Sequence, residues 1–319
     1  MATAPSSSPL RLAFFGTPDF AVPTLERLIE GRHEVVTVVC QPDRRRGRGR
    51  KTSPAPVAEV ALSAGVPLMR RESVADDEGL AEFRAHKPDL GVVVAFGQFL
   101  PKRIREAPAL GYLINGHASL LPRYRGAAPI ARCLLDGATV TGVSAMRVER
   151  EMDSGPVALQ RKIEIGEHEN AGELSERLSK LTADTLEGVI EQIADNRVSW
   201  VPQDDTRATF APKIRHSDGQ LIWTESAQAL CRRVRAMAPS PGAFTTFEGE
   251  SLQILDARSD ESLADVAPGT VRMGPARELR IATGDGWVLP RILQRPGRRA
   301  LGVEVFVRGR PIPDGTLLG

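Results

Sequence analysis

The sequence has little cysteine and no long apolar run. Its three cysteines, Cys40, Cys133 and Cys231, are odd in number and widely separated, and no C-x-x-C pair occurs. This pattern excludes a disulfide framework and a cysteine-rich zinc site, and it favours small buried thiols in a reduced, cytoplasmic protein. No apolar stretch approaches the roughly 20 residues that a membrane-spanning helix needs, so no membrane association is expected.

The sequence also lacks an excess of charge. It has 42 Lys and Arg residues against 40 Asp and Glu, a formal net charge of +2. The chain as a whole is therefore not a polycation, and any contact with nucleic acid must come from local charge. Residues 1–9, MATAPSSSP, have no basic start followed by an apolar run. They are expected to form a disordered lead-in and not a secretory signal.

The first two thirds of the chain alternate apolar, β-branched runs with helical patterns. Strands are expected at residues 12–15, 35–40, 89–95, 113–114 and 143–148, and helices at 20–29, 127–135 and 171–193. This alternation predicts the α/β class, with a doubly wound, mostly parallel, Rossmann-like sheet. In such sheets, functional side chains gather in the loops at the carboxyl ends of the strands.

The pattern changes near residue 200, and a chain of 319 residues suits two domains. Residues 201–212 are polar and aperiodic, as expected of a linker. Beyond them, one helical pattern at 227–237 is followed by short strands separated by Gly and Pro, which predicts a small, OB-like β-barrel. We therefore expect a catalytic domain at 10–200 and a second domain at 213–319.

Residues 111–155 carry the clearest chemistry. Asn115 and His117 follow one predicted strand and Asp153 follows the next, so the carboxyl-end rule predicts that all three lie at one edge of the sheet. An amide can donate to a developing oxyanion, a histidine can exchange a proton, and a carboxylate can orient that histidine. Together they suit acyl transfer to an amine without a covalent intermediate, and no G-x-S-x-G nucleophile motif occurs. From residue type alone, a structural histidine and turn-forming Asn-Gly and Asp-Ser-Gly segments remain open.

Three motifs in this region resemble those of the folate-dependent formyltransferases. Residues 114–122 resemble the I-N-x-H-x-S-L-L-P signature, residues 123–130 extend the match, and residues 152–155 resemble the downstream aspartate motif. The resemblance implies a formyltransferase-type Rossmann-like domain and 10-formyltetrahydrofolate as co-substrate. No group of residues with metal-ligand spacing occurs, so no metal is expected.

The resemblance also implies roles for individual residues. Asn115 donates to the formyl oxygen as it becomes negative, His117 assists and shuttles protons, and Asp153 orients His117 and helps to deprotonate the attacking amine. Two segments border the pterin ring of the folate, largely through backbone groups: Ser119, Leu120, Leu121 and Pro122, and Val94, Ala95, Phe96 and Gly97. Relatives often have a larger residue at the position of Gly116. A glycine at this position is expected to loosen the local backbone.

A basic segment follows the second predicted strand. It places six cations within eight residues, with no acidic residue between Asp43 and Glu59; the cations are Arg44, Arg45, Arg46, Arg48, Arg50 and Lys51. Its two glycines are expected to keep it flexible until it meets RNA. It resembles the inserted loop that transfer-RNA formyltransferases place against the acceptor stem, with Arg48 and Lys51 as the strongest candidates. A solvated basic loop is the alternative.

Further resemblances point to the same acceptor. Residues 15–20 resemble the F-x-G-T-P-x-F start of the transfer-RNA formyltransferases and lack the G-x-G-x-x-G dinucleotide fingerprint. Residues 211–214 and 235–243 resemble the start of their barrel domain, which adds a basic face. Arg232, Arg233 and Arg235 belong to that face or are arginines that extend along a helix to solvent. The implied partner is initiator methionyl-tRNA, and no obligate protein partner is evident.

Three alternatives remain at this stage. A formyltransferase for a small amine, glycinamide ribonucleotide or an amino sugar nucleotide, would keep the three catalytic candidates but would have little use for the basic segment. A non-catalytic RNA-binding relative would be expected to have lost those candidates. A nucleotide-dependent dehydrogenase is suggested by fold class alone, and the missing glycine fingerprint counts against it.

Overall fold

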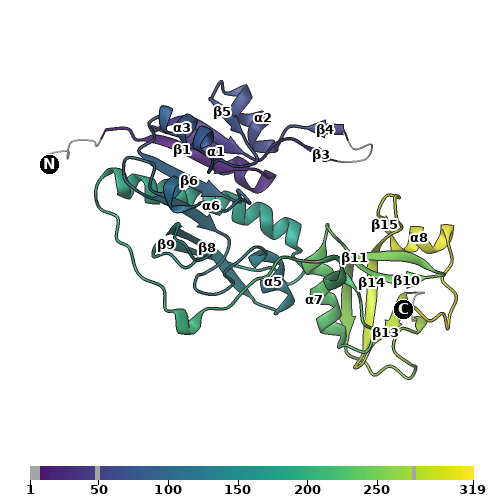
Figure 1. Ribbon diagram of the computed structural model, residues 1–319. Helices are drawn as coiled ribbons and strands as arrows, with labels where there is room; N and C mark the ends of the chain where they lie inside the picture. The colour runs from purple at the N-terminus through teal and green to yellow at the C-terminus, as the bar shows by residue number, and fades with distance from the viewer. Residues whose placement is uncertain (1–7, 47–50, 275–277) are drawn as a thin grey trace. The chain divides into compact units, whose positions relative to one another are not determined.

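The chain folds into two compact units (Figure 1). The computed structural model describes residues 8–46, 51–274 and 278–319, so most of the expected disordered lead-in, residues 1–7, lies outside the described residues. Unit 1 comprises Met1–Gly126, Val140–Ile163 and Ser175–Phe210, and unit 2 comprises Ala127–Thr139, Glu164–Leu174 and Ala211–Gly319. Each unit has its own sheet.

Unit 1 is built on a seven-stranded sheet in the order β5-β2-β1-β6-β7-β8-β9. The first five strands in this order are parallel, and β8 pairs antiparallel with β7. Their bounds are β1 Arg11–Gly16, β2 Glu34–Cys40, β5 Leu68–Arg70, β6 Leu90–Val94, β7 Leu113–His117, β8 Val140–Arg147 and β9 Val157–Glu164. The predicted mostly parallel sheet is confirmed, and each strand expected in this region belongs to it.

Alternation along β1 divides the core of unit 1 between the two faces of the sheet. Leu12 and Phe14 point to one face, while Ala13 and Phe15 point to the other, and all four are fully buried. Helices α1 (Val22–Glu30), α2 (Pro56–Ser63) and α6 (Ala171–Ala194) supply apolar side chains to the first face. Helices α3 (Asp77–Ala85) and α4 (Lys102–Arg105) cover the second. The sheet is therefore doubly wound, as predicted.

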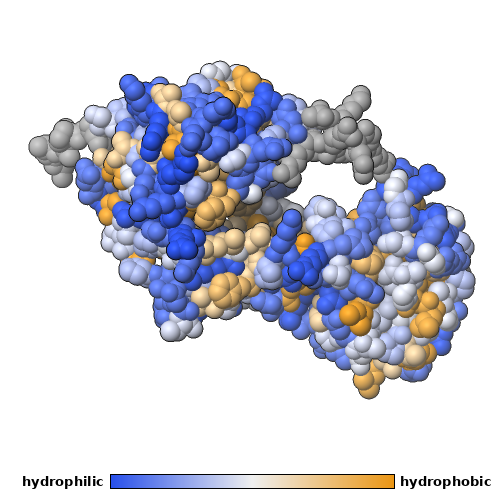
Figure 2. All heavy atoms as spheres, in the orientation of Figure 1, coloured by the Kyte–Doolittle hydropathy of each residue, from blue (hydrophilic) through white to orange (hydrophobic). Residues whose placement is uncertain are grey.

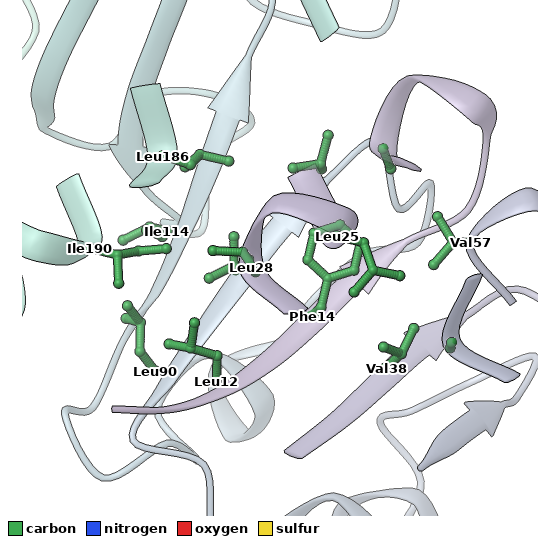
Figure 3. Close-up of a cluster of buried hydrophobic side chains, with 14 of the residues drawn as sticks. Leu12, Phe14, Leu25, Leu28, Val38, Val57, Leu90, Ile114, Leu186 and Ile190 are labelled. Atoms are coloured by element: carbon green, nitrogen blue, oxygen red, sulfur yellow. The ribbon is translucent and has the colours of Figure 1, made fainter. Parts of the chain in front are cut away.

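Figure 3 shows the core on the first face. Leu25 and Leu28 of α1 lie against the strands, and Leu186 and Ile190 of α6 lie beside Ile114 of β7. Each fully buried side chain of this size stabilises the fold by about 1.5–3 kcal/mol relative to exposure. The helix α6 is thereby fixed against the strand that carries Asn115 and His117.

Unit 2 contains an antiparallel sheet in the order β10-β11-β14-β13-β12, with β15 added to β14 (Figure 1). The strands are β10 Ala243–Phe247, β11 Glu250–Asp260, β12 Val271–Met273, β13 Leu279–Ala282, β14 Trp287–Gln294 and β15 Leu301–Gly302. The register between β11 and β14 shifts on both sides of Asp256, and such bulges bend a strand. The sheet accordingly curls into a half-barrel, which agrees with the barrel architecture predicted for this part.

Several helices accompany this sheet or precede it. Helix α7 (Ala227–Met237) packs on β11 and on α5 (Pro129–Leu135), and α8 (Val303–Gly309) packs on β14. Short 3-10 helices occur at Asp19–Ala21, Asp205–Arg207 and His216–Gly219. Helices α1, α5, α6 and α7 were predicted from the sequence, whereas α2, α3, α4 and α8 were not.

The surface is dominated by hydrophilic residues, with apolar side chains in small scattered groups on the face shown in Figure 2. Within residues 8–46, 51–274 and 278–319, no helix is both long enough and apolar enough to cross a membrane.

Candidate active site

Strand β7 presents Asn115 and His117 on one face of the sheet. Side chains alternate along a strand, so these two residues share the face of Leu113, which packs in the core beneath α3 and α4. His117 is 6% exposed, whereas Asn115 is partly open to solvent. Among the described residues, the Asn115 side chain has no hydrogen-bond partner. Its N–H groups are therefore available to an incoming ligand.

Both ring nitrogens of His117 face hydrogen-bond acceptors. Nε2 lies 2.9 Å from the carbonyl oxygen of Tyr124, and Nδ1 lies 3.5 Å from Oδ2 of Asp153. A carbonyl oxygen can only accept, so Nε2 must carry a proton to form the first contact. Nδ1 is consequently the nitrogen that can take up and release a proton, and it faces the carboxylate. The sequence predicted that these two side chains come together, and the structure places them in contact.

Asp153 reaches His117 by a path that the carboxyl-end rule did not predict. Strand β8 runs antiparallel to β7, with Ser144 opposite His117 and Arg147 opposite Ile114. The carboxyl end of β8 therefore lies beside the amino end of β7. This is the edge of the sheet opposite to the one at which His117 lies. The loop after β8 must fold back across the sheet face to bring Asp153 to the histidine. Our reason for placing Asp153 at the same edge was wrong, although it does meet His117.

One backbone group fixes the Asp153 carboxylate. The N–H of Gly126 donates to its Oδ2 at 2.8 Å. Asp153 itself has φ +54°, in the left-handed region that non-glycine residues seldom adopt. Tyr124 (φ +60°) and Ala95 (φ +46°) share this feature, and six non-glycine residues among those described have it. Such strained backbone concentrates at functional sites, and two of these positions, Ala95 and Asp153, are predicted site residues, while Tyr124 contacts His117.

The segment from Ser119 to Pro122 is rigidly held. Ser119 is fully buried, and its hydroxyl donates to the carbonyl of Arg123 at 2.6 Å. The hydroxyl of Ser144 donates to the Ser119 carbonyl at 2.7 Å and accepts from the N–H of Leu121 at 3.0 Å. The amide of Gln160 donates to the Leu121 carbonyl at 2.9 Å. Ser144 and Gln160 thus support this loop, and no sequence motif singled them out.

Not every residue of the two predicted folate segments is open to a ligand. Val94 and Phe96 are buried, with 0% and 2% exposure, whereas Ala95 and Gly97 between and beyond them are exposed. Leu121 is also buried, while Leu120 and Pro122 are partly exposed. A ligand that lies along these segments can therefore reach only every second side chain, together with the backbone. This arrangement suits the predicted backbone contacts better than side-chain contacts.

Hydrogen bonds of Gln41 link the segments that follow three neighbouring strands at one edge of the sheet. Its side-chain amide donates to the carbonyl of Phe96 at 2.9 Å, and its backbone N–H approaches the hydroxyl of Thr17 at 3.3 Å. Thr17 in turn donates to the same carbonyl at 3.2 Å. Because these residues follow β2, β1 and β6, the edge that contains Gly97 is built from all three strands. Gln41 lies three residues before Arg44, the first residue of the basic segment.

The basic segment forms a two-stranded antiparallel ladder. Strand β3 (Arg44–Arg46) pairs with β4 (Lys51–Ser53), and Arg46 lies opposite Lys51. We expected Gly47 and Gly49 to keep the segment flexible, and both glycines lie outside the described residues. Asp43 precedes the ladder, and its carboxylate accepts a hydrogen bond from Arg70 at 2.8 Å. This bond fixes the residue that comes directly before β3. Arg48 and Arg50 lie outside the described residues.

The arginines of α7 make contacts within unit 2. Arg233 pairs with Glu225 at 3.0 Å, and Arg232 donates to Gln228 at 2.9 Å. Arg235 donates to the carbonyl of Gly166 at 3.3 Å, and burial lowers the pKa of its guanidinium. All three side chains therefore have partners within unit 2.

The environments of Cys40 and Cys231 do not favour the thiolate that a nucleophile requires. Burial raises the pKa of Cys40 to about 11 and that of Cys231 to about 12, so both stay protonated near neutral pH. All three cysteines are free and buried, in keeping with the predicted role as small core residues. Within the described part of the chain, no group of three or more His, Cys, Asp or Glu residues could hold a metal ion.

Gly116 is required by packing. A Cβ at this position would lie 2.5 Å from Cγ2 of Thr182 and 2.9 Å from Cδ1 of Leu186, both on α6. Gly116 faces away from Asn115 and His117 and lets α6 approach β7 closely. We expected this glycine to loosen the backbone, and that expectation was wrong because the residue lies within β7 and under a helix.

Replacing Gly116 by alanine should destabilise unit 1. Overpacking of a well-packed core costs about 1–3 kcal/mol, and a denaturant titration should show this as a lowered midpoint. Gly188→Ala is the matched control on α6, because its nearest neighbour to a new Cβ is at 3.7 Å. Alanine there should raise stability by up to about 1 kcal/mol through helix propensity. An unchanged midpoint for Gly116→Ala would contradict the packing argument.

Comparison with known proteins agrees with this architecture. Residues 10–190 match the family model described as formyl transferase, and residues 213–311 match the formyl transferase C-terminal domain. The chain is 41% identical over 312 residues to a methionyl-tRNA formyltransferase of Moorella thermoacetica, covering 97% of this chain and 99% of the relative. It is 39% identical to a protein of the same name in Pelobacter propionicus, covering 97% and 96%.

A solved structure shares the fold at low identity. The sugar 3N-formyl transferase WlaRD, crystallised in the presence of dTDP and 5-N-formyl-THF, superposes with a TM-score of 0.66 at 14% identity. The match covers 91% of this chain and 99% of that one. The full-length identity to the curated relatives, however, is far higher and carries the assignment. The chain belongs to the methionyl-tRNA formyltransferase family.

Proposed function

We propose that this enzyme transfers the formyl group of 10-formyltetrahydrofolate to the free amino group of methionine on initiator tRNA. The product is N-formylmethionyl-tRNA, which serves translation initiation in the cytoplasm. The observation that carries the proposal is the arrangement at β7: an amide without a partner among the described residues, beside a histidine in contact with a carboxylate. These are the groups that acyl transfer to an amine requires.

The proposed reaction passes through a tetrahedral intermediate. The methionine nitrogen attacks the formyl carbon, and the carbonyl electrons move to the formyl oxygen. Asn115 donates a hydrogen bond to that oxygen as it becomes negative. Collapse of the intermediate re-forms the carbonyl and breaks the bond from carbon to N10 of the folate. One proton leaves the amine and one is gained by N10, so no net proton is released.

His117 and Asp153 carry the proton transfers in this scheme. Nδ1 of His117 faces the carboxylate at 3.5 Å while Nε2 is occupied by the Tyr124 carbonyl. A protonated ring can therefore donate at both nitrogens to groups already in place. Because imidazole and carboxylate are in contact, we assign the proton to the pair and not to one residue.

The folate is proposed to bind along two segments already described. Ala95 and Gly97 present exposed backbone after β6, and Leu120 and Pro122 are partly exposed after β7. Buried Ser119, Leu121, Val94 and Phe96 are proposed to fix the shape of these segments. The hydroxyl of Ser144 holds the backbone of Ser119 and Leu121 through two hydrogen bonds. A segment held in this way suits binding of the flat pterin ring in one fixed position.

The acceptor is proposed to bind through the β3–β4 ladder and the segment that joins its strands. Cations that neutralise phosphates release counterions and make binding sensitive to salt. The proposed contacts are Arg44, Arg45, Arg46, Arg48, Arg50 and Lys51. We further propose residues 10–200 as the catalytic domain, 201–212 as the linker and 213–319 as a tRNA-binding domain.

Replacing Arg48 by alanine should weaken tRNA binding and reduce the slope of log affinity against log salt by about one. Folate binding should not change. Lys180→Ala, which removes an exposed cation from α6, is the matched control and should leave the slope unaltered. A filter-binding series in rising salt measures both, and an unaltered slope for Arg48→Ala would mean that Arg48 does not contact phosphate.

The decisive experiment offers methionyl initiator tRNA and glycinamide ribonucleotide as competing acceptors. Formylation of the tRNA alone, lost in His117→Ala, supports the proposed function and locates the site. Transfer to the small amine alone would leave the folate chemistry intact but contradict the proposed acceptor. Transfer to neither would contradict the proposal as a whole.

A further inference from the structure

A segment that the sequence suggested was a linker lies against the candidate active site. We call residues 203–210 the strap; they follow α6 and belong to unit 1. The strap contacts the two loops that flank His117, one carrying Tyr124 and Gly126 and the other carrying Asp153. Arg125 and Phe210 form an isolated parallel β-bridge between the strap and the first loop.

The Gln203 side chain is saturated with hydrogen bonds to both loops. Its Nε2 donates to the carbonyl of Asp153 at 2.8 Å and to that of Gly155 at 2.7 Å. Its Oε1 accepts from Nε and Nη2 of Arg125, at 3.0 and 2.8 Å. A carboxamide has two donor hydrogens and two acceptor lone pairs, so all four are used. One side chain thereby ties the aspartate loop to the tyrosine loop.

Arg125 is itself held in a defined position. It is 6% exposed, and its Nη2 also contacts Oδ1 of Asp205 at 2.7 Å. Its backbone N–H donates to the carbonyl of Thr209 at 2.8 Å, and the hydroxyl of Thr209 accepts from the N–H of Tyr124 at 2.8 Å. The strap therefore fixes the residue on each side of the peptide that joins Tyr124 to Arg125.

These bonds converge on the partners of His117. The Tyr124 carbonyl receives Nε2 of the ring, and the N–H of Gly126, next to Arg125, holds the Asp153 carboxylate. Asp153 has φ +54°, a conformation that persists only when surrounding contacts enforce it. The Gln203 bond to the Asp153 carbonyl is one such contact, and it acts on the residue whose side chain faces Nδ1.

We propose that Gln203 is a positioning residue, which sets the Asp153 carboxylate against His117 by clamping the Asp153–Gly155 loop to Arg125. The inference rests on the proposed function, because it assigns Gln203 a part in the same reaction. Gln203 touches neither the formyl donor nor the acceptor in this scheme. It acts only through Asp153.

Gln203→Glu tests the clamp with almost no change in shape. The glutamate can still accept from Arg125, but its second oxygen replaces the donor that faced the carbonyls of Asp153 and Gly155. We expect kcat to fall about tenfold or more, since misplacing a reacting group by about 1 Å can cost 100-fold. The KM values for methionyl-tRNA and folate should stay within about twofold. Arg207→Gln, which alters an exposed side chain of the strap, is the control and should keep kcat within about twofold.

A double-mutant cycle separates positioning from general support. In an Asp153→Asn background, Gln203→Glu should lower kcat less than about twofold, because the residue that it positions no longer carries its charge. An equal loss in both backgrounds, or a normal kcat for the single variant, would overturn the inference. Thermal unfolding is measured on every variant, and Gln203→Met replaces Gln203→Glu if the latter does not fold. Transfer activity of the unaltered protein is measured first. If the unaltered protein transfers no formyl group, the proposed function is refuted, and this result is distinct from a failure of the inference about Gln203.

Discussion

Replacing Asn115 by alanine is expected to lower kcat about 100-fold or more, with little change in KM for either substrate. The amide projects from β7 on the face of His117 and has no hydrogen-bond partner among the described residues. A donor of this kind contributes chiefly when the formyl oxygen becomes negative, so its loss appears in kcat. Removing one oxyanion donor typically costs about 2.7–4 kcal/mol of transition-state stabilisation. Single-turnover formylation of methionyl-tRNA measures the chemical step directly.

Asn115→Asp sharpens this test because it keeps the shape of the side chain. The aspartate has only acceptors and a negative charge, so it should repel the developing oxyanion and be at least as slow as the alanine variant. Asn115 is partly exposed, and neither change should unfold the protein. Near-normal turnover in Asn115→Ala would remove the oxyanion role. A large rise in KM at constant kcat would make Asn115 a binding residue instead.

The central strands of the main sheet could be predicted because they are short, buried on both faces and separated by turn residues. Leu12–Phe15 in β1 and Leu90–Val94 in β6 are apolar throughout, which is typical of central parallel strands. Helix α6 was equally clear from its long apolar repeat. Short elements such as β5 carry too few residues for periodicity to identify them.

The direction of β8 could not be predicted from the sequence, and it changes how the site is built. An antiparallel strand within a mostly parallel sheet has no distinct local pattern when both faces are covered. Asp153 was therefore placed near His117 for a reason that does not hold, since its loop returns over the sheet face from the opposite edge. Motif resemblance, not the rule about strand ends, identified the pair.

The strap escaped prediction for a related reason. Residues 201–206 are polar and aperiodic, which in sequence is indistinguishable from a solvated linker. What distinguishes them is that Gln203 and Thr209 find backbone partners about 50 and 85 residues earlier in the chain. Such long-range side-chain bonds leave no local signature. The same holds for Ser144 and Gln160, which brace the Ser119–Leu121 loop.

Asp153→Asn should lower kcat on the order of 100-fold or more, because it removes the charge that faces Nδ1 of His117 while keeping the shape of the side chain. Asparagine tolerates the positive φ of this position and can still accept from the N–H of Gly126 through its oxygen. A loss of activity would therefore reflect the proton pathway and not a collapsed loop. Stopped-flow or quench measurements at saturating substrates give kcat without interference from binding.

Glu151→Gln provides the matched control for this variant. It neutralises an exposed carboxylate two residues away in the same loop, so any general effect of charge on tRNA binding is reproduced without touching His117. Its kcat should stay within about twofold of the native value, as expected for a surface change. If the two variants were equally active, the carboxylate beside His117 would have no part in moving the proton. The histidine would then have to act with the Tyr124 carbonyl as its sole protein partner among those described, and Gln203, which acts through Asp153, would lose its role as well.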